Sequence, residues 1–285
     1  MSVLADVAEK GFAIVRLDGP PRALRESASA SPFTFAERLL GVPPLFVERQ
    51  PIRPVDGGRS FASTRVDTPL HTDSQMVLGV PAAIQVLICI DPAPRGGESL
   101  LLDTAPLLAR LERDDPSLVK DLFEVDRHQR FYFHDVSGPT IALRGGHLAW
   151  SVAPGRLGEE DDVGRRLGRV LARERLFEHT LRAGEALVAS NHRVLHGRRP
   201  FEGERELVRL LVWLEEPLPA DPRHVARARE LAPRPPAATV KKLRAVLAIL
   251  RGAPPAKTAH DAGVDEPTLY AWRDAFVRGG LTGLG

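Results

Sequence analysis

The fold is decided by residues 82–103, AAIQVLICIDPAPRGGESLLLD. Residues 82–90 form a nearly continuous apolar run closed by Asp91-Pro92, and such a run is typical of a buried strand. Arg95-Gly96-Gly97 is a turn signal, and residues 98–102 predict the next strand. We therefore expect these two strands to pair as a hairpin in a β-rich core.

Short segments on either side of this stretch extend the pattern. Further strands are expected at 11–17, 130–134, 140–144, 147–151, 185–189 and 207–214, and helices at 33–41, 104–111 (with Thr104 as N-cap) and 160–179. Residues 51–69, rich in Pro, Gly, Arg and Thr, are expected to form an extended loop. Many short strands with a few helices predict an α+β domain built on a β-sandwich or jelly roll.

Composition sets few limits on function. The chain has 285 residues, 43% of them hydrophobic, and a net charge of +2, which is too small to require a polyanionic partner. Cys89 is the only cysteine, so the chain can form no internal disulfide. We see no signal peptide and no apolar stretch long enough to span a bilayer, so we expect a cytoplasmic protein with no membrane contact. The oligomeric state stays open.

Two distant segments offer metal ligands. They are Leu70-His71-Thr72-Asp73 and residues 191–198, NHRVLHGR. Two imidazoles and one carboxylate form the set that holds Fe(II) on one face and leaves the other face open, which allows oxygen chemistry. His71-Thr72-Asp73 alone is a weak signal, because a hydrogen-bonded loop histidine gives the same triplet. It is, however, the only His-x-Asp or His-x-Glu in the chain.

Five ordered blocks carry a family resemblance. They are residues 61–73 (FAST followed by PLHTD), 84–87 (IQVL), 96–103 (GGESLLLD), 191–198 and 204–207 (EREL). Together they resemble the Fe(II)/2-oxoglutarate-dependent oxygenases, within the group of taurine dioxygenase, γ-butyrobetaine hydroxylase and clavaminate synthase. The resemblance implies a double-stranded β-helix (jelly-roll) core with flanking helices, which we place at residues 1–218.

The resemblance also implies roles for residues. His71, Asp73 and His196 are the implied catalytic iron ligands. Arg205 is the implied partner of the distal 2-oxoglutarate carboxylate, since a planar guanidinium grips a carboxylate with two hydrogen bonds. Ser99 stands where the family places a Ser or Thr that also touches the co-substrate.

Other residues are assigned more loosely. Arg209, four positions after Arg205 on a predicted strand, shares its face and is expected to bind the co-substrate or an acidic group of the substrate, with a rim ion pair as the alternative. Gln85 and Asn191 are substrate-binding candidates. His192 is expected to be structural.

The implied reaction uses Fe(II), 2-oxoglutarate and O2, releases succinate and CO2, and hydroxylates an unactivated C–H bond of a small molecule. Desaturation and cyclisation are alternatives. We expect an amino acid or an amino-acid-derived metabolite as substrate. A metalloenzyme that does not use 2-oxoglutarate is a further alternative.

The end of the chain has a different texture. Residues 219–238 are expected to be a Pro/Arg-rich linker, and residues 239–285 a separate all-α module that resembles a helix-turn-helix. Asp265 is its expected N-cap, and Pro267 lies in the first turn. We expect this module to serve in docking, in dimerisation or as a lid. A DNA-binding regulator that responds to 2-oxoglutarate or a metabolite is the alternative, although Asp265, Glu266 and Asp274 oppose phosphate.

Overall fold

The structure is a computed structural model that describes residues 2–77, 79–131, 135–154, 161–232 and 237–282. The chain divides into two compact units, Met1–Ala232 and Pro233–Gly285. Each unit is described by itself below. The first unit is a mixed α+β structure, and the helices of the second are described last.

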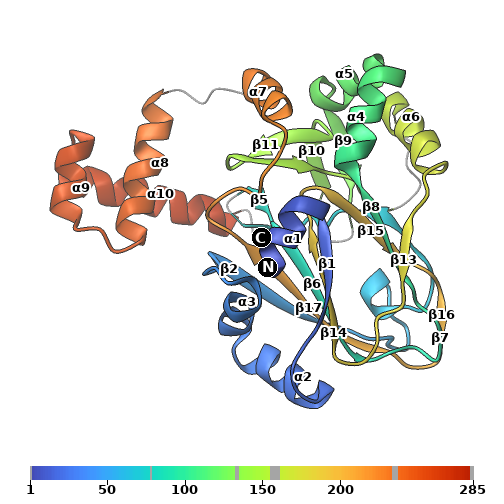
Figure 1. Cartoon of the computed structure of the whole chain (residues 1–285). Helices are drawn as coiled ribbons and strands as arrows, with labels where there is room; N and C mark the ends of the chain where they lie inside the picture. The colour runs from blue at the N-terminus through green and yellow to red at the C-terminus, as the bar shows by residue number, and fades with distance from the viewer. Residues whose placement is uncertain (1, 78, 132–134, 155–160, 233–236, 283–285) are drawn as a thin grey trace. The chain divides into compact units, whose positions relative to one another are not determined.

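A five-stranded antiparallel sheet forms the centre of the first unit (Figure 1). Its strands, in order, are β1 (Phe12–Arg16), β14 (Glu185–Ser190), β6 (Ile84–Asp91), β17 (Glu206–Trp213) and β2 (Phe46–Ile52). The expected strand at 82–90 is thus β6, in the middle of the sheet.

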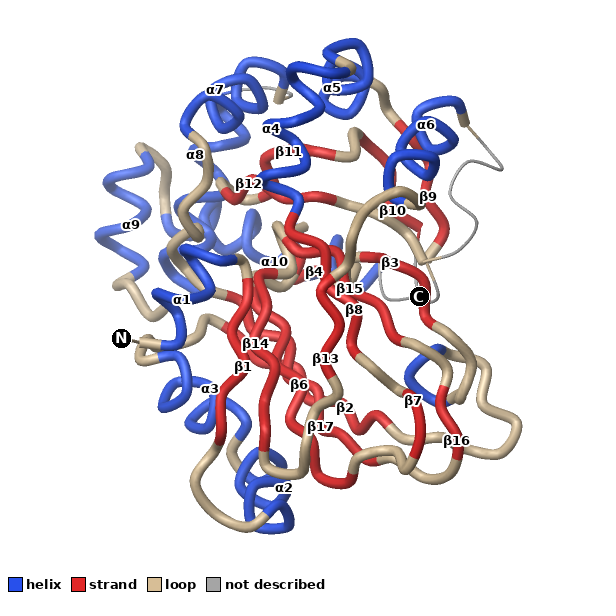
Figure 2. The backbone as a smooth tube through the Cα atoms, turned by 45° about the vertical axis from the view of Figure 1, so that its right-hand side comes forward, coloured by secondary structure: helices blue, strands red, loops and turns tan. Residues whose placement is uncertain are grey.

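A four-stranded antiparallel sheet faces this larger sheet (Figure 2). Its strands are β13 (Phe177–His179), β8 (Ser99–Asp103), β15 (Val194–Arg198) and β3 (Thr68–His71). Cys89 and Leu187 of the large sheet pack against Leu101 and Val194 of the small one. An apolar layer between the sheets therefore joins them.

Helices cover the other face of the large sheet. They are α1 (Val3–Lys10), α2 (Pro21–Ala30) and α3 (Pro32–Leu40), which pack against Ile84, Val86 and Ile88 of β6. Because side chains alternate along a strand, Gln85 and Leu87 point to the opposite face, toward the small sheet. Burial of both faces explains why β6 is apolar almost throughout.

The expected hairpin of β6 and β8 is wrong, because these strands belong to different sheets. Between them, Gly96 and Gly97 adopt φ values of 71° and 80°, which favour glycine. The two-residue strand β7 (Arg95–Gly96) pairs with β16 (Phe201–Glu202) instead of closing a hairpin. The chain therefore crosses from one sheet to the other at this turn.

The remaining elements of the first unit flank the two sheets. They are η1 (Phe61–Ser63), β4 (Met76–Val77), β5 (Val80–Pro81), α4 (Thr104–Asp114), α5 (Pro116–Glu124), β9 (Arg127–Arg130), β10 (Asp135–Gly138), β11 (Ile141–Arg144), β12 (His147–Trp150), α6 (Asp162–Leu171) and α7 (Pro222–Leu231). Leu107, Leu118 and Leu167 bring α4, α5 and α6 into one core cluster.

Several expectations for these elements need correction. The N-cap of α4 is Asp103, which accepts a hydrogen bond from the backbone of Ala105, while the Thr104 hydroxyl bonds the Arg193 carbonyl. The expected helix at 160–179 ends at Leu171, and β13 follows it. Of the expected strand at 130–134, residues 132–134 lie outside the described residues.

The second unit consists of α8 (Ala237–Leu250), α9 (Pro255–Ala262) and α10 (Glu266–Thr282). Gly263 ends α9 with φ of 63°, and Asp265 accepts a 2.9 Å hydrogen bond from the backbone of Thr268. The expected N-cap is therefore present. Its small core is built from Ala245, Ala259, Ala262 and Leu269.

Part of the stretch expected to be a linker is helical. Residues 222–231 form α7, whose Ala228 packs into the core of the first unit and whose His224 lies 2.8 Å from Glu112 of α4. Among the described residues, we find no helix long and apolar enough to cross a membrane. A cytoplasmic location stays a prediction.

Candidate metal centre

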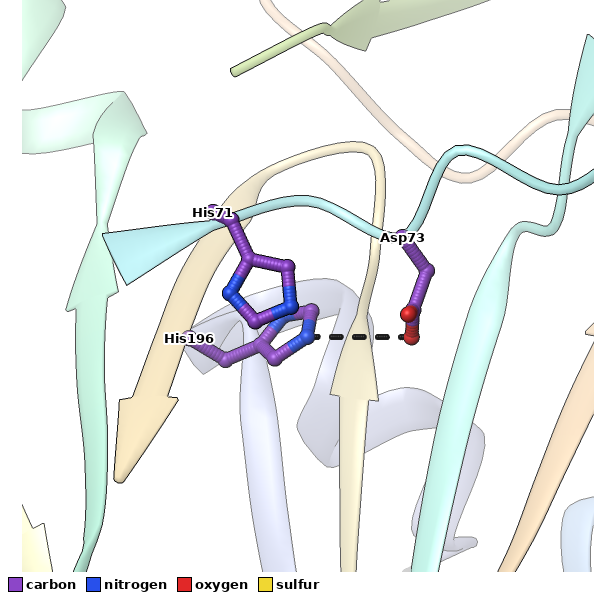
Figure 3. A group of neighbouring side chains, drawn as sticks. All are labelled: His71, Asp73 and His196. Carbon is purple, nitrogen blue, oxygen red and sulfur yellow. Dashed lines mark ion pairs between the residues drawn. The ribbon is translucent and has the colours of Figure 1, made fainter. Parts of the chain in front are cut away.

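Two strands of the small sheet bring three candidate ligands together (Figure 3). His71 ends β3 and is the register partner of His196 in β15, so their ring centroids are 4.3 Å apart. Asp73 follows two residues after His71. One ligand atom from each of His71, Asp73 and His196 lies within 4.8 Å of the others, so the cluster is compact enough to hold one metal ion.

Asn191 holds Asp73 in place. Its side-chain oxygen accepts a 2.7 Å hydrogen bond from the Asp73 backbone, and its amide nitrogen donates 3.0 Å bonds to the carbonyls of Asp73 and Ala82. The residue is 1% exposed, and these three bonds engage both amide protons and the carbonyl oxygen. Asn191 therefore positions the backbone of Asp73, and its carboxamide is not turned toward a substrate as expected.

Both imidazoles are neutral. His71 Nδ1 donates a 2.9 Å hydrogen bond to the Pro69 carbonyl, which leaves the Nε2 lone pair free for a metal. Burial lowers the pKa of His71, and burial together with the nearby His71 ring lowers the pKa of His196 to about 3. These rings need lose no proton before they bind a cation at neutral pH.

Asp73 is the charged member of the cluster. Burial opposes its ionisation, but the Arg209 guanidinium and the two imidazoles hold the pKa of this carboxyl below its usual value. The side chain is ionised and almost fully buried. The cluster thus offers one carboxylate and two neutral imidazoles, a ligand set that suits a divalent transition metal.

Gln85 and Arg209 both contact this carboxylate. The Gln85 amide nitrogen donates to Asp73 Oδ2 and lies 2.9 Å from Nε2 of His196. Arg209 Nη1 donates a 2.6 Å hydrogen bond to Asp73 Oδ1, and its Nη2 donates to Gln50. The sequence assigned Gln85 to substrate and Arg209 to co-substrate or substrate, whereas the structure places both against the candidate ligands.

A cavity beside the cluster contains Arg205. Its lining includes His71, Gln85, Ser99, His196, Arg198, Arg205, Leu207 and Arg209. Arg205 is 7% exposed and its guanidinium lies over the Phe201 ring, 5.5 Å from the centroid. Burial lowers the pKa of Arg205, and among the described residues it has no hydrogen-bond or ion-pair partner. We call this space the Arg205 cavity. A buried cation without an anion favours a negatively charged ligand there.

Arg198 also lines this cavity, and we did not single it out from the sequence. Its guanidinium donates to the carbonyls of Phe61 and Thr64 at 3.1 and 3.0 Å. Burial and the nearby Arg205 lower the pKa of Arg198 to about 10. The residue holds the 61–66 segment against the site. In the sequence, the signal that could have pointed to Arg198 was its position in the triplet His196-Gly197-Arg198.

A second small cavity adjoins His71 and Asp73. It is lined by Ser60, Phe61, Ala62, His71, Thr72, Asp73, Ser74, Gln75, Phe131, Pro154 and Arg209. Four of these, Phe61, Ala62, His71 and Arg209, also line the Arg205 cavity. We call it the Asp73 cavity. The two cavities therefore share part of their walls, and His71 lines both.

Residues 35–211 match the family model described as taurine catabolism dioxygenase TauD, TfdA family. The chain belongs to the TauD/TfdA dioxygenase family. Membership confirms the predicted dioxygenase and the family named from the sequence. Residues 236–285 match a homeodomain-like domain, in agreement with the helix-turn-helix resemblance.

Solved structures of similar fold agree with the TauD/TfdA assignment. An asparagine oxygenase with Fe(II), 2S,3S-3-hydroxyasparagine and succinate is 19% identical with a TM-score of 0.56, over 74% of this chain and 78% of that chain. The non-heme iron oxygenase OrfP with Fe and alpha-ketoglutaric acid is 18% identical with a TM-score of 0.52, over 75% and 78%. At this identity they show the oxygenase fold alone. No curated protein matches the chain.

Proposed function

We propose that this TauD/TfdA dioxygenase uses Fe(II), 2-oxoglutarate and O2 to hydroxylate a C–H bond of an amino acid or an amino-acid-derived small molecule, with release of succinate and CO2. One observation carries the proposal. The compact cluster of His71, Asp73 and His196 borders a cavity in which the buried Arg205 lacks an anionic partner among the described residues.

His71, Asp73 and His196 are the proposed iron ligands. Two neutral imidazoles and one carboxylate are the donors that suit Fe(II) while leaving coordination positions open. When bound, the iron supplies the oxidising chemistry together with 2-oxoglutarate and O2. The protein's part is to hold Asp73 through Asn191 and to keep both imidazoles neutral.

Arg205 is the proposed anchor for the distal carboxylate of 2-oxoglutarate. Its guanidinium can give two parallel hydrogen bonds, which orient a carboxylate as well as bind it. The Ser99 hydroxyl, buried on the same cavity wall, is the proposed second contact. We infer that Arg209 remains at Asp73, where it lines both cavities and stands within reach of either co-substrate or substrate.

The Asp73 cavity is the proposed substrate side. Ser74 and Gln75 offer polar contacts there, and Phe131 and Pro154 offer apolar ones. The solved structures of similar fold contain hydroxylated amino acids, 3-hydroxyasparagine in one and 3-hydroxyarginine in another, which favours this substrate class. We further propose that the facing sheets form a double-stranded β-helix within an oxygenase domain of residues 1–218.

An anaerobic titration tests this function. Apo-protein receives Fe(II) and then 2-oxoglutarate, and the weak visible charge-transfer band of chelated 2-oxoglutarate is recorded. We expect the band in the wild type and its loss in His71→Ala. His179→Ala, which alters a histidine outside the cluster, is the control and should keep the band. Iron binding without the band would contradict the proposed co-substrate.

DNA binding through the homeodomain-like unit is the second candidate function. Lys241, Arg244 and Lys257 line one groove of this unit, which offers a basic surface to phosphates. Fluorescence anisotropy of a labelled duplex, measured from 50 to 200 mM salt, tests it, because contacts to phosphate make affinity fall steeply with salt. Absence of binding at low salt would leave docking or dimerisation as its role.

A further inference from the structure

One glutamine side chain of the large sheet reaches two of the candidate metal ligands. Gln85 lies in the central strand β6 and is 2% exposed. Its amide nitrogen donates to Oδ2 of Asp73 and lies 2.9 Å from Nε2 of His196. These two ligand atoms are 3.7 Å apart (Figure 3). A single NH2 group therefore bridges Asp73 and His196.

The Asp73 carboxylate fixes the orientation of the Gln85 amide. An ionised carboxylate only accepts hydrogen bonds, so the NH2 group of Gln85 must face Oδ2, and its carbonyl oxygen must point away. That carbonyl oxygen is buried and has no hydrogen-bond partner among the described residues. The hydrogen bonds of the Gln85 carboxamide are thus made through its nitrogen alone.

The same NH2 group decides the tautomer of His196. An amide nitrogen has no lone pair to offer, so Nε2 of His196 is the acceptor in this contact and the ring proton sits on Nδ1. Nε2 then carries the lone pair that the proposed iron would use. Gln85 therefore presents His196 in the tautomer that a metal needs.

A hydrogen bond and a metal bond cannot share this lone pair. A neutral imidazole has one acceptor nitrogen with one lone pair, whereas each carboxylate oxygen has two. Asp73 can therefore bind a metal and keep its bond from Gln85, but His196 must release Gln85. His71 needs no such exchange, because its Nδ1 donates to the Pro69 carbonyl and leaves Nε2 free.

We propose that Gln85 is a positioning residue that presents the Nε2 lone pair of His196 and gives it up when the metal binds, so that its amide competes with the ion. The inference rests on the proposed iron site. It assigns Gln85 to metal loading, whereas the sequence suggested substrate binding. Metal binding exchanges one buried amide–imidazole hydrogen bond for a bond to the ion, so Gln85 lowers metal affinity by the net value of that hydrogen bond.

Gln85→Leu tests the competition, because leucine offers neither an amide proton nor a metal ligand. Anaerobic competition with a chelator of known affinity, without 2-oxoglutarate, gives the dissociation constant for Fe(II). We expect Gln85→Leu to bind Fe(II) about two- to ten-fold more tightly than the wild type, the equivalent of one net neutral hydrogen bond. Urea denaturation of the metal-free variant should show lower stability, because Asp73 loses a buried donor. A residue that only supported the site would weaken metal binding as well.

Thr104→Val is the matched control. The Thr104 hydroxyl is buried and gives a 2.6 Å hydrogen bond to the Arg193 carbonyl. The residue lines neither the Arg205 cavity nor the Asp73 cavity. Thr104→Val should also lose stability, but it should bind Fe(II) as the wild type does. The control thus separates the loss of a buried hydrogen bond from the loss of a competing donor.

A spectroscopic signature follows the exchange directly. Zn(II) is diamagnetic, so heteronuclear NMR can observe the side-chain amide of Gln85 while this ion is added. The signal is assigned by its absence in Gln85→Leu. Release of His196 removes an acceptor and should move one amide proton of Gln85 upfield. The amide of Gln129, which bonds the Ser151 carbonyl at 2.9 Å, is the reference and should not move.

Two results would overturn this inference and leave the proposed function intact. One is Fe(II) binding by Gln85→Leu that is equal to or weaker than that of the wild type. The other is a Gln85 amide signal that Zn(II) does not move. Failure of the wild type to bind either ion would instead refute the ligand set, and this inference with it. The 2-oxoglutarate band described above reports on the proposed function separately.

Discussion

The Arg209 guanidinium lies 2.6 Å from the carboxylate of Asp73, and both side chains are buried. The large sheet thus supplies a cation to a residue that follows β3 of the small sheet. In the absence of a metal, the Arg209 guanidinium balances the negative charge of the Asp73 carboxylate, to which the metal is expected to bind. Arg209 and Arg205 line the same cavity, but among the described residues Arg209 has an anionic partner and Arg205 has none.

This difference predicts opposite effects on stability. Arg209→Met should lower the free energy of unfolding of the metal-free protein by about 3 kcal/mol, because it leaves a buried carboxylate unpaired. Arg205→Met should leave it unchanged or raise it, since no protein anion loses its partner. Urea denaturation at pH 7 with chelator measures both. Equal losses in the two variants would contradict the pairing.

Arg205 should instead control affinity for 2-oxoglutarate. Arg205→Met is expected to raise the dissociation constant about 100-fold, and Arg205→Lys less, because lysine keeps the charge but gives no fork of two hydrogen bonds. The anaerobic charge-transfer titration measures both. Arg65→Lys, at an exposed surface pair, serves as control. An unchanged constant in Arg205→Met would remove this residue from the co-substrate site.

Asn191 should matter to metal affinity although it is not a ligand. Asn191→Ala removes two hydrogen bonds to the Asp73 backbone and is expected to weaken Fe(II) binding about 10- to 100-fold, the range seen for residues that orient ligands. Competition with a chelator of known affinity gives the constant. Ser190→Ala, one position away, is the matched control and should bind iron as the wild type does.

Acid should destabilise the metal-free protein partly through His192. Its pKa is about 4 in the folded state and about 6.5 in an unfolded chain, so the unfolded state binds more protons between these values. The contribution of His192 to stability is therefore complete above pH 6.5. As the pH drops from 6.5 toward 4, the free energy of unfolding falls by about 1.4 kcal/mol per pH unit because of this residue. His192→Gln should show a shallower slope in urea denaturations from pH 6 to 4.5. Parallel curves for the two proteins would show that His192 does not contribute.

The turn between β6 and β8 should tolerate no side chain at Gly96. A Cβ atom there would lie 2.2 Å from the Pro200 carbonyl oxygen, and the φ of 71° is itself unfavourable for other residues. Gly96→Ala should cost about 3 kcal/mol or prevent folding. Gly146→Ala has a φ of 90° but open space around the added atom, so it should cost about 1 kcal/mol. Similar thermal midpoints for the two variants would refute the steric argument.

Local patterns in the sequence predicted elements better than pairings. The apolar run at 82–90 gave β6, and the Asp265 cap with Gly263 gave the turn between α9 and α10. The partner of β8 was missed, because a glycine turn is compatible both with a hairpin and with a crossover between sheets. That choice depends on β16, which is about a hundred residues later in the chain.

For the candidate site, too, the sequence predicted some features and not others. The ligand set followed from the residues of two motifs, together with the family resemblance. The contacts of Gln85 and Arg209 with Asp73 did not, because they depend on the register of β6 and β17, in which Leu87 stands opposite Arg209. The carboxamide bonds of Asn191 likewise require Asp73 and Ala82 to meet in space.

Because His71 of β3 pairs with His196 of β15, the proposed iron site can form only late in the synthesis of the chain. A chain that has left the ribosome only through β8 carries His71 and Asp73 but lacks the third proposed ligand and the Asn191 clamp. Since domains fold as units while they emerge, the proposed iron site is complete only after β15 has been made. Nascent chains that end before β15 therefore cannot assemble the proposed oxidising centre, whereas Arg205 and Arg209 of its cavity are made only after the ligands are complete.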